Sequence, residues 1–269
     1  MIPVVSAAQM QTLDRRAATE CGIPTLLLME AAGAEAAREI SAACPGASAG
    51  RVTVLCGRGN NGGDGFVVAR RLLAAGGTVR SFLLARPEEV QGDARVNLEA
   101  LERMGNAPLS LTAAELPRLA EALAEADLLV DAMLGTGTRG PARGLFAEVI
   151  DLVNRAGRPV VSLDLPSGLE ADSPEIPGPA VRADFTVTFA WPKPCLFLYP
   201  AAGLAGTLRV ADIGIPRSLL GASGVRLHLL EPSDVRPAFP PRDPAGHKGT
   251  YGHVLVLAGS PGKTGAAAL

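Results

Sequence analysis

The residues in this sequence whose types and spacing could do chemistry begin with the glycine-rich segment GRGNNGGDG at 57–65. It separates a short β-branched run from a stretch with helical periodicity, so its backbone N–H groups would stand at the beginning of a helix. Free N–H groups at that end favour an anion, because the helix dipole adds partial positive charge there. The segment predicts a phosphate site. The alternatives are a turn whose glycines only permit tight packing, with Asp64 as a helix N-cap.

A second glycine-rich segment, GTGTRG at 135–140, follows an apolar run that ends near Asp131. The hydroxyls of Thr136 and Thr138 and the guanidinium of Arg139 could contact a second phosphate. Two anion sites in neighbouring loops suggest a dinucleotide. The alternative is a flexible glycine loop in which Arg139 is a solvated surface charge.

Two carboxylates, Asp131 and Asp164, each end an apolar run that has the composition of a buried strand. An unpaired carboxylate is costly to desolvate there, so each needs hydrogen-bond donors, a cation or a catalytic purpose. We expect one to bind a metal and the other to move protons. The alternative for each is an N-cap to the following helix.

Alternating strands and helices must position these groups. Helical periodicity predicts helices at 6–20, 24–43, 66–77, 91–104 and 143–156, and apolar runs predict strands at 51–57, 78–84, 127–134, 159–166, 184–190 and 206–213. Parallel strands need crossover connections, so this alternation indicates an α/β fold. We expect a doubly wound, mostly parallel, Rossmann-like sheet with helices on both faces, and a ligand beyond the carboxyl ends of its strands near the switch in strand order.

Composition excludes several classes of protein. The chain has 269 residues and a formal net charge of -2, without the basic stripe that nucleic acid requires. Its four cysteines form no C-x-x-C pair, which fits a reducing cytoplasm. No leader sequence and no uninterrupted apolar run of membrane-spanning length is present, so neither export nor membrane insertion is expected.

The chain length predicts one to two domains. A first domain is expected over 1–215, followed by a proline-rich linker over 216–245. Residues 246–269 read as the strand, loop and helix that open a further domain. The Ala-rich opening helices could cover the sheet or form a homodimer interface.

Four strings stand in order on this predicted sheet: NNGGDG, VDAMLGTG, SLDLPSG and TFAWPKPCLFLYP. Together they resemble the NAD(P)H-hydrate epimerase family, the YjeF N-terminal domain, over about residues 1–215. The tail from residue 247 resembles the opening of an ADP-dependent NAD(P)H-hydrate dehydratase domain of ribokinase-like fold. The resemblance is thus to a bifunctional repair enzyme cut short within its second domain, and no dehydratase activity is expected from this chain.

The resemblance implies that the chain epimerises the R and S hydrates of NADH and NADPH (NADHX and NADPHX) at C6 of the reduced nicotinamide ring. It implies substrate contacts at Asn60, Asn61, Gly62, Gly63, Asp64, Gly135, Thr136, Gly137, Thr138, Arg139, Gly140, Pro141 and Asp164. Asp164 is the expected catalytic acid or base, if partial desolvation raises its pKa. Lys193 also matches a lysine of the family pattern, and its alternative is a solvated loop charge.

A potassium ion is implied at Asn61, Asp131 and Ser167. Hard cations prefer oxygen ligands, and an amide carbonyl, a carboxylate and a hydroxyl supply them. A set with only one charged ligand suits a monovalent ion. Outside the enzyme class, a non-catalytic nucleotide-binding or scaffold module is the alternative, because the same fold can bind a ligand without acting on it.

Overall fold

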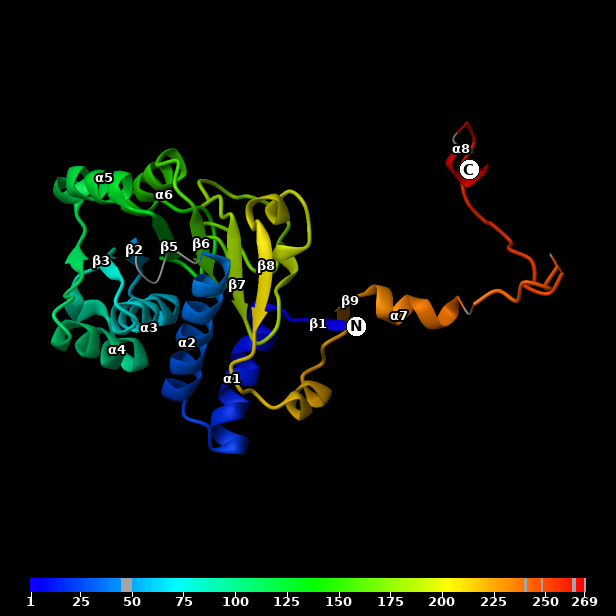
Figure 1. The fold of residues 1–269 in the computed structure, drawn as a ribbon, viewed down its shortest axis with the longest axis horizontal. Coiled ribbons are helices and arrows are strands. Elements are labelled where there is room, and N and C mark those ends of the chain that lie inside the picture. Colours follow the sequence, from blue (N-terminus) through cyan, green and yellow to red (C-terminus); the bar gives the residue numbers. More distant parts are fainter. Residues whose placement is uncertain (45–49, 240, 248, 263–264, 269) are drawn as a thin grey trace. The chain divides into compact units, whose positions relative to one another are not determined.

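The computed structural model describes residues 1–44, 50–239, 241–247, 249–262 and 265–268. A parallel seven-stranded sheet of order β4-β3-β2-β5-β6-β7-β8 forms the centre of the compact unit of residues 2–229 (Figure 1). The strands are β2 (Arg51–Cys56), β3 (Thr78–Leu83), β4 (Leu109–Ser110), β5 (Leu128–Ala132), β6 (Val160–Leu163), β7 (Phe185–Phe189) and β8 (Thr207–Ala211). The chain runs outwards from β2 to β4 and then returns to the other side of β2 at β5. The predicted doubly wound α/β sheet is confirmed.

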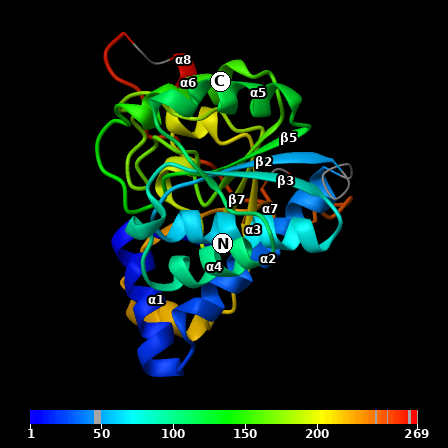
Figure 2. The same cartoon turned by 90° about the vertical axis from the view of Figure 1, so that its left-hand side faces the viewer.

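Helices cover both faces of this sheet (Figure 2). One face carries α1 (Ala7–Cys21), α2 (Thr25–Ala43), α3 (Asn60–Ala74) and α4 (Gly92–Arg103), and the other carries α5 (Leu116–Glu125) and α6 (Leu145–Arg155). Strand β2 serves both cores: Val54 and Cys56 pack on the α2–α3 side, whereas Leu55 packs on the α5–α6 side. Successive side chains of a strand point to opposite faces, and for this reason a strand covered on both sides is apolar throughout.

Helix α3 begins at Asn60, whereas its apolar periodicity predicts a start near Phe66. The glycines expected in a loop are therefore in the first two turns of the helix. A Cβ added to Gly63 would lie 2.6 Å from the Met29 sulfur, and one on Gly65 would lie 2.6 Å from the Ala132 Cβ. The loop prediction was wrong for these residues, and tight packing is the reason for their glycines.

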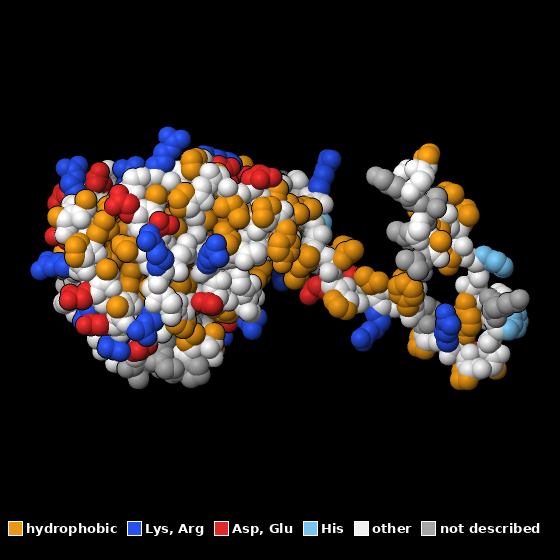
Figure 3. Space-filling model, turned by 90° about the horizontal axis from the view of Figure 1, so that it is seen from above, with side chains coloured by type: hydrophobic (Ala, Val, Ile, Leu, Met, Phe, Trp, Pro, Cys, Tyr) orange, Lys and Arg blue, Asp and Glu red, His pale blue; other side chains and the backbone are white. Residues whose placement is uncertain are grey.

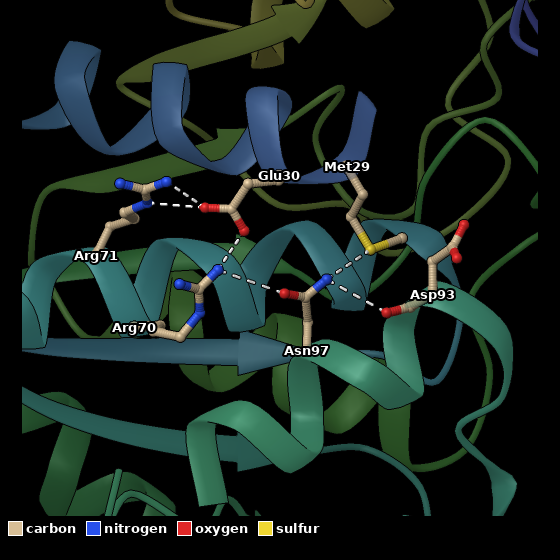
Figure 4. A network of polar contacts seen from close by, with 6 residues as sticks. All are labelled: Met29, Glu30, Arg70, Arg71, Asp93 and Asn97. Atoms are coloured by element: carbon tan, nitrogen blue, oxygen red, sulfur yellow. Dashed lines mark hydrogen bonds and ion pairs between the residues drawn. The ribbon is translucent and has the colours of Figure 1, made fainter. Parts of the chain in front are cut away.

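A polar network joins α2, α3 and α4 behind this contact (Figure 4). The Glu30 carboxylate accepts hydrogen bonds from Arg70 and Arg71, and Arg70 also donates to Asn97 at 3.5 Å. Asn97 in turn donates to the Met29 sulfur at 3.4 Å. The network therefore fixes the three helices around the side chain that packs on Gly63.

Two short elements, β4 and α5, lie in a segment for which the sequence patterns predict no element. A further pair, β1 (Ile2–Val4) and β9 (Leu227–Leu229), is antiparallel. With it, residues 2–229 form one compact unit, so 216–229 belong to that unit rather than to the expected linker.

On the molecular face in Figure 3, acidic and basic side chains are interspersed.

Met1 and residues 230–269 form a second unit with the short helices α7 (Pro232–Val235) and α8 (Gly265–Ala268). The strand expected at its start does not form: Val254 and Leu255 are exposed and belong to no strand. Residues 248, 263–264 and 269 of the expected further domain lie outside the described residues. Of the helices in the described ranges, none is long and apolar enough to cross a lipid bilayer.

Candidate active site

A cavity of about 690 Å³ opens at the carboxyl ends of the central strands. Its walls come from the segments that follow β2, β3, β5, β6 and β7 and from helices α1 and α2. The strand order reverses between β2 and β5, and loops on the two sides of such a reversal diverge and leave a crevice. The cavity therefore lies where the sequence predicts a ligand.

The N-terminus of α3 forms one wall of the cavity. Its N-cap is Gly59, which has no side chain to accept hydrogen bonds from the first N–H groups of the helix, and Asn60, Asn61 and Gly62 line the cavity. N–H groups at a helix start that lack a side-chain cap suit an anion. The wall also requires glycine, because a Cβ on Gly62 would lie 1.8 Å from the Gly57 carbonyl oxygen.

Asp64 and Gly63, the other two predicted substrate contacts of this segment, differ in the structure: only Asp64 lines the cavity. Asp64 lines the cavity and is buried within α3, so it is not the N-cap of the helix. Gly63 does not line the cavity, because it packs against Met29 and Ala94. Its glycine is explained by helix packing.

The second glycine-rich segment lines the cavity only in its first half. Gly135, Thr136, Gly137 and Thr138 line it, whereas Arg139, Gly140 and Pro141 do not. The exposed Arg139 guanidinium lies 3.5 Å from Asp172, and the Gly140 N–H donates to Glu170 at 2.5 Å. This segment therefore offers hydroxyl and backbone groups to a ligand, whereas its Arg139 faces the Asp172 carboxylate and not the cavity.

Asp131 holds the segments after β5 and β6 together. It is 1% exposed, and its carboxylate accepts hydrogen bonds from Ser162 Oγ at 2.8 Å, from the Ser167 N–H at 2.8 Å and hydroxyl at 2.5 Å, and from the Met133 N–H at 3.2 Å. Burial raises the pKa of Asp131, while the bonds from Ser167, Ser162 and Met133 lower it. Its donors are thus side chains and backbone of these segments, and it caps no helix.

Asn61 carries the polar atom that fits a cation. Its amide nitrogen donates to the Leu134 carbonyl at 2.9 Å, but its Oδ1 is buried with no hydrogen-bond partner among the described residues. Ser167 Oγ lies 3.3 Å from the same Leu134 carbonyl and touches Asp131. The three residues implied as potassium ligands therefore share one locality, and an oxygen is left over there. No group of three or more His, Cys, Asp or Glu side chains with metal-binding geometry occurs within the described ranges.

Asp164 and Lys193 form a buried ion pair on the cavity wall. Lys193 is 1% exposed, and its ammonium donates to Asp164 Oδ1, to Thr188 Oγ1 at 3.1 Å and to the Phe189 carbonyl at 3.1 Å. Thr188 and the Phe189 N–H add contacts to the same Asp164 oxygen at 3.3 and 3.4 Å. The interpretation of Lys193 as a solvated loop charge was wrong, because all three ammonium hydrogens have partners inside the protein.

Two more carboxyls line the cavity near this pair, Asp64 from α3 and Asp14 from α1. Burial raises the pKa of Asp64 well above its ordinary range, and the neighbouring Asp164 and Asp14 raise it further. Burial also raises the pKa of Asp14 to about 6, although Lys193 opposes the shift. The wall thus combines an ion-paired carboxylate with carboxyls that retain their protons at higher pH.

The sequence patterns gave Asp14 no role. Asp14 lies within a helix, away from any strand end or glycine-rich segment, and nothing in its immediate neighbours distinguishes it from a solvent-facing residue. The periodicity of α1 predicts a helix packed on the sheet, but no sequence pattern places that helix beside the cavity that Asp14 lines.

Comparisons with known proteins agree with this geometry. The family model described as YjeF-related protein N-terminus matches residues 25–195. The bifunctional NAD(P)H-hydrate repair enzyme Nnr of Moorella thermoacetica is 50% identical over 99% of this chain and 51% of its own length. The chain therefore spans about half the length of this curated relative.

Shorter proteins match over most of their length. The NAD(P)H-hydrate epimerase of Pirellula staleyi is 42% identical over 77% of this chain and 91% of its own. The crystal structure of yeast ynu0 superposes with a TM-score of 0.71 at 27% identity, covering 86% of this chain and 97% of that one. With its cavity at the β2–β5 reversal, its glycine-rich α3 N-terminus and these matches, the chain belongs to the YjeF N-terminal family, the family of the NAD(P)H-hydrate epimerases.

Proposed function

We propose that this chain interconverts the R and S forms of hydrated NADH and NADPH at C6 of the reduced nicotinamide ring. The observation that carries the proposal is the buried Asp164–Lys193 pair in the same cavity as the N-terminus of α3, which has no side-chain cap. One cavity thus offers a proton-transfer group and an anion site, which a dinucleotide with a reactive ring can occupy together. The activity named for the Pirellula relative supports the same reaction.

The chemistry of the hydrate makes a modest catalyst sufficient. Its C6 hydroxyl is adjacent to the ring nitrogen, so the carbon is a hemiaminal whose C–O bond breaks with help from the nitrogen lone pair. In this proposal the N–H groups of Asn60, Asn61 and Gly62 bind the diphosphate, and that remote contact positions C6. Asp164, held in one orientation by Lys193, exchanges a proton with the departing or entering oxygen.

The residues implied as potassium ligands fit a monovalent cation. Asn61 Oδ1 and Ser167 Oγ would hold it, with the Asp131 carboxylate and main-chain carbonyls such as that of Leu134. Bound there, the ion would supply positive charge close to the phosphate-binding wall.

The cytoplasm is the proposed compartment, supported by the fact that all four cysteines are free thiols.

The test is to incubate the purified chain with one pure epimer of hydrated NADH and to follow the other by chromatography, in potassium and in sodium buffer. We expect conversion, and faster conversion in potassium. Asp164→Asn is expected to reduce kcat roughly 10² to 10⁴-fold. Its binding, followed by the fluorescence of Trp191, should change less than about threefold.

The matched control is Asp151→Asn, the same chemical change at an exposed residue of α6, which should leave the rate unchanged. A chain that binds both epimers and converts neither would be the non-catalytic nucleotide-binding module. Full activity in Asp164→Asn would remove Asp164 from the reaction.

A further inference from the structure

Asp14 is a half-buried carboxyl of the cavity. Neither the proposed substrate contacts nor the proposed cation site gives this carboxyl a role. It projects from the middle of α1 into the cavity that Asp164 and Lys193 line. No group of the described residues donates a hydrogen bond to it, whereas Asp164 has three donors. A carboxyl in this setting is free to exchange protons with a ligand.

The charged groups around Asp14 come from three other segments. Asp64 lies on α3, Asp164 directly follows β6 and Lys193 follows β7, while α2 contributes only apolar and hydroxyl side chains to this part of the cavity. At the rim the charged groups are Arg58, Glu89 and Asp93. The deeper groups are the carboxyls of Asp14, Asp64 and Asp164 and the ammonium of Lys193. If these four groups together carry no net charge, two of the three carboxyls hold a proton.

Epimerisation as proposed above needs this kind of arrangement. The hydroxyl leaves from one face of the ring and water returns to the other, so an acid must act at one face and a base at the other. After one turnover the two groups have exchanged roles. A single fixed carboxyl can serve both faces only if the ring turns over within the site.

We propose that Asp14 is the second proton-transfer group of this reaction and that it works in tandem with Asp164. The inference rests on the proposed function. In one direction the Asp14 carboxyl gives its proton to the departing oxygen: the C6–O bond breaks with its electron pair on oxygen, water leaves, and the ring nitrogen lone pair forms the iminium double bond. A water molecule then bonds to the opposite face of C6, the double-bond electrons return to nitrogen, and the Asp164 carboxylate takes the proton.

The electrostatics of the cavity suit this exchange. Lys193 interacts with both carboxyls, so moving one proton from Asp14 to Asp164 leaves the net charge of the three groups unchanged. The pKa of Asp14, raised to about 6, keeps a fraction of this carboxyl protonated as the pH approaches neutrality. Asp64 is more deeply buried, and burial raises its pKa well above the ordinary range, so it suits a permanent hydrogen-bond donor. Asp14 is partly exposed and can recover its proton from solvent.

The test compares Asp14→Asn, Asp14→Glu and the control Asp151→Asn in the full chain, with pure R and pure S hydrate as probes. Asp14→Asn should lower kcat at least 100-fold in both directions, and Trp191 fluorescence should report binding within about threefold of wild type. Asp14→Glu keeps the carboxyl and should recover at least tenfold over Asp14→Asn. Wild-type kcat/KM should fall with rising pH above about 6, as the required proton is lost.

The outcomes separate the two proposals. If the wild type converts neither epimer, the proposed function fails. If the wild type is active but Asp14→Asn keeps its rate and pH profile, only the role of Asp14 fails, and Asp164 alone serves both faces. If Asp14→Asn does not fold, Asp14→Glu and the wild-type profile decide: a rate that stays level from pH 6 to 8 overturns the role of Asp14.

Discussion

Asp164 has a backbone conformation that residues with a side chain rarely adopt, with φ at +66°. Such a conformation costs on the order of 1–3 kcal/mol and persists only where the surroundings enforce it. Lys193, Thr188 and Phe189 supply the enforcing contacts, all to one carboxylate oxygen. Asp164 Oδ2 has no hydrogen bond among these contacts and remains available to a ligand.

Lys193→Met tests this arrangement. The substitution leaves the Asp164 carboxylate without its counter-charge in a largely buried position, so we expect the free energy of unfolding to fall by about 3–5 kcal/mol. Epimerisation should fall with it, because the carboxylate loses its fixed orientation. Urea denaturation and kcat are the measurements.

Adding Asp164→Asn to Lys193→Met provides the control. The double variant has no uncompensated charge, so it should recover stability but not activity. If Lys193→Met is as stable as wild type, the pair does not hold the site together.

The sequence predicts site residues well where chain position determines their place. Asp131 lies near the end of β5 and Asp164 directly follows β6, and parallel strands end at one edge of the sheet, so both lie at the edge that bears the cavity. No rule of this kind predicts that Lys193 and Asp14 reach the cavity. The burial of Lys193 depends on the Asp164 partner supplied from another strand, and Asp14 reaches the cavity only because α1 packs beside it.

At the scale of elements, the beginning of α3 decides the shape of the site. Six of the seven strands of the parallel sheet followed from apolar runs, and the doubly wound arrangement followed from the parallel connection rule, but the start of α3 did not. Glycine has low helix propensity, and local patterns therefore place it in a loop. Contacts with Met29 and Ala132, which no local pattern contains, select glycine inside this helix.

Gly63→Ala tests whether that close contact holds α2 against α3. The new Cβ would meet the Met29 sulfur at 2.6 Å, so the Met29 side chain must leave its place against α3, and we expect a loss of about 1–3 kcal/mol in unfolding free energy. Thermal and urea denaturation measure it. Gly221→Ala is the control, since its Cβ would meet nothing within 4 Å. Equal stability of the two variants would contradict the packing explanation.

At the scale of the whole molecule, the compact unit continues past the boundary that the proline pattern predicts. Leu219 is 5% exposed, Arg16 donates to its carbonyl at 2.9 Å, and β9 pairs with β1. Prolines suggest a linker because they interrupt helices and strands, yet short 3-10 turns tolerate them. Composition alone therefore set the end of the unit too early.

Two shortened chains test the boundary. Residues 1–229 should keep the melting temperature of the site-bearing unit and its activity. Residues 1–215 lack Leu219 and β9, and should lose at least about 2 kcal/mol of unfolding free energy from exposed apolar surface alone. Calorimetry of both chains is the measurement, and equal melting temperatures would favour the earlier boundary.

The β1–β9 pairing sets Ile2 opposite Leu229, so the compact unit starts and finishes at one spot. A chain with neighbouring ends can be cut elsewhere and rejoined there by a short bridge without altering its interior. It can also be spliced into a loop of a host protein as a cassette. Such a graft would leave the order of the seven parallel strands intact, and with it the cavity at the β2–β5 reversal.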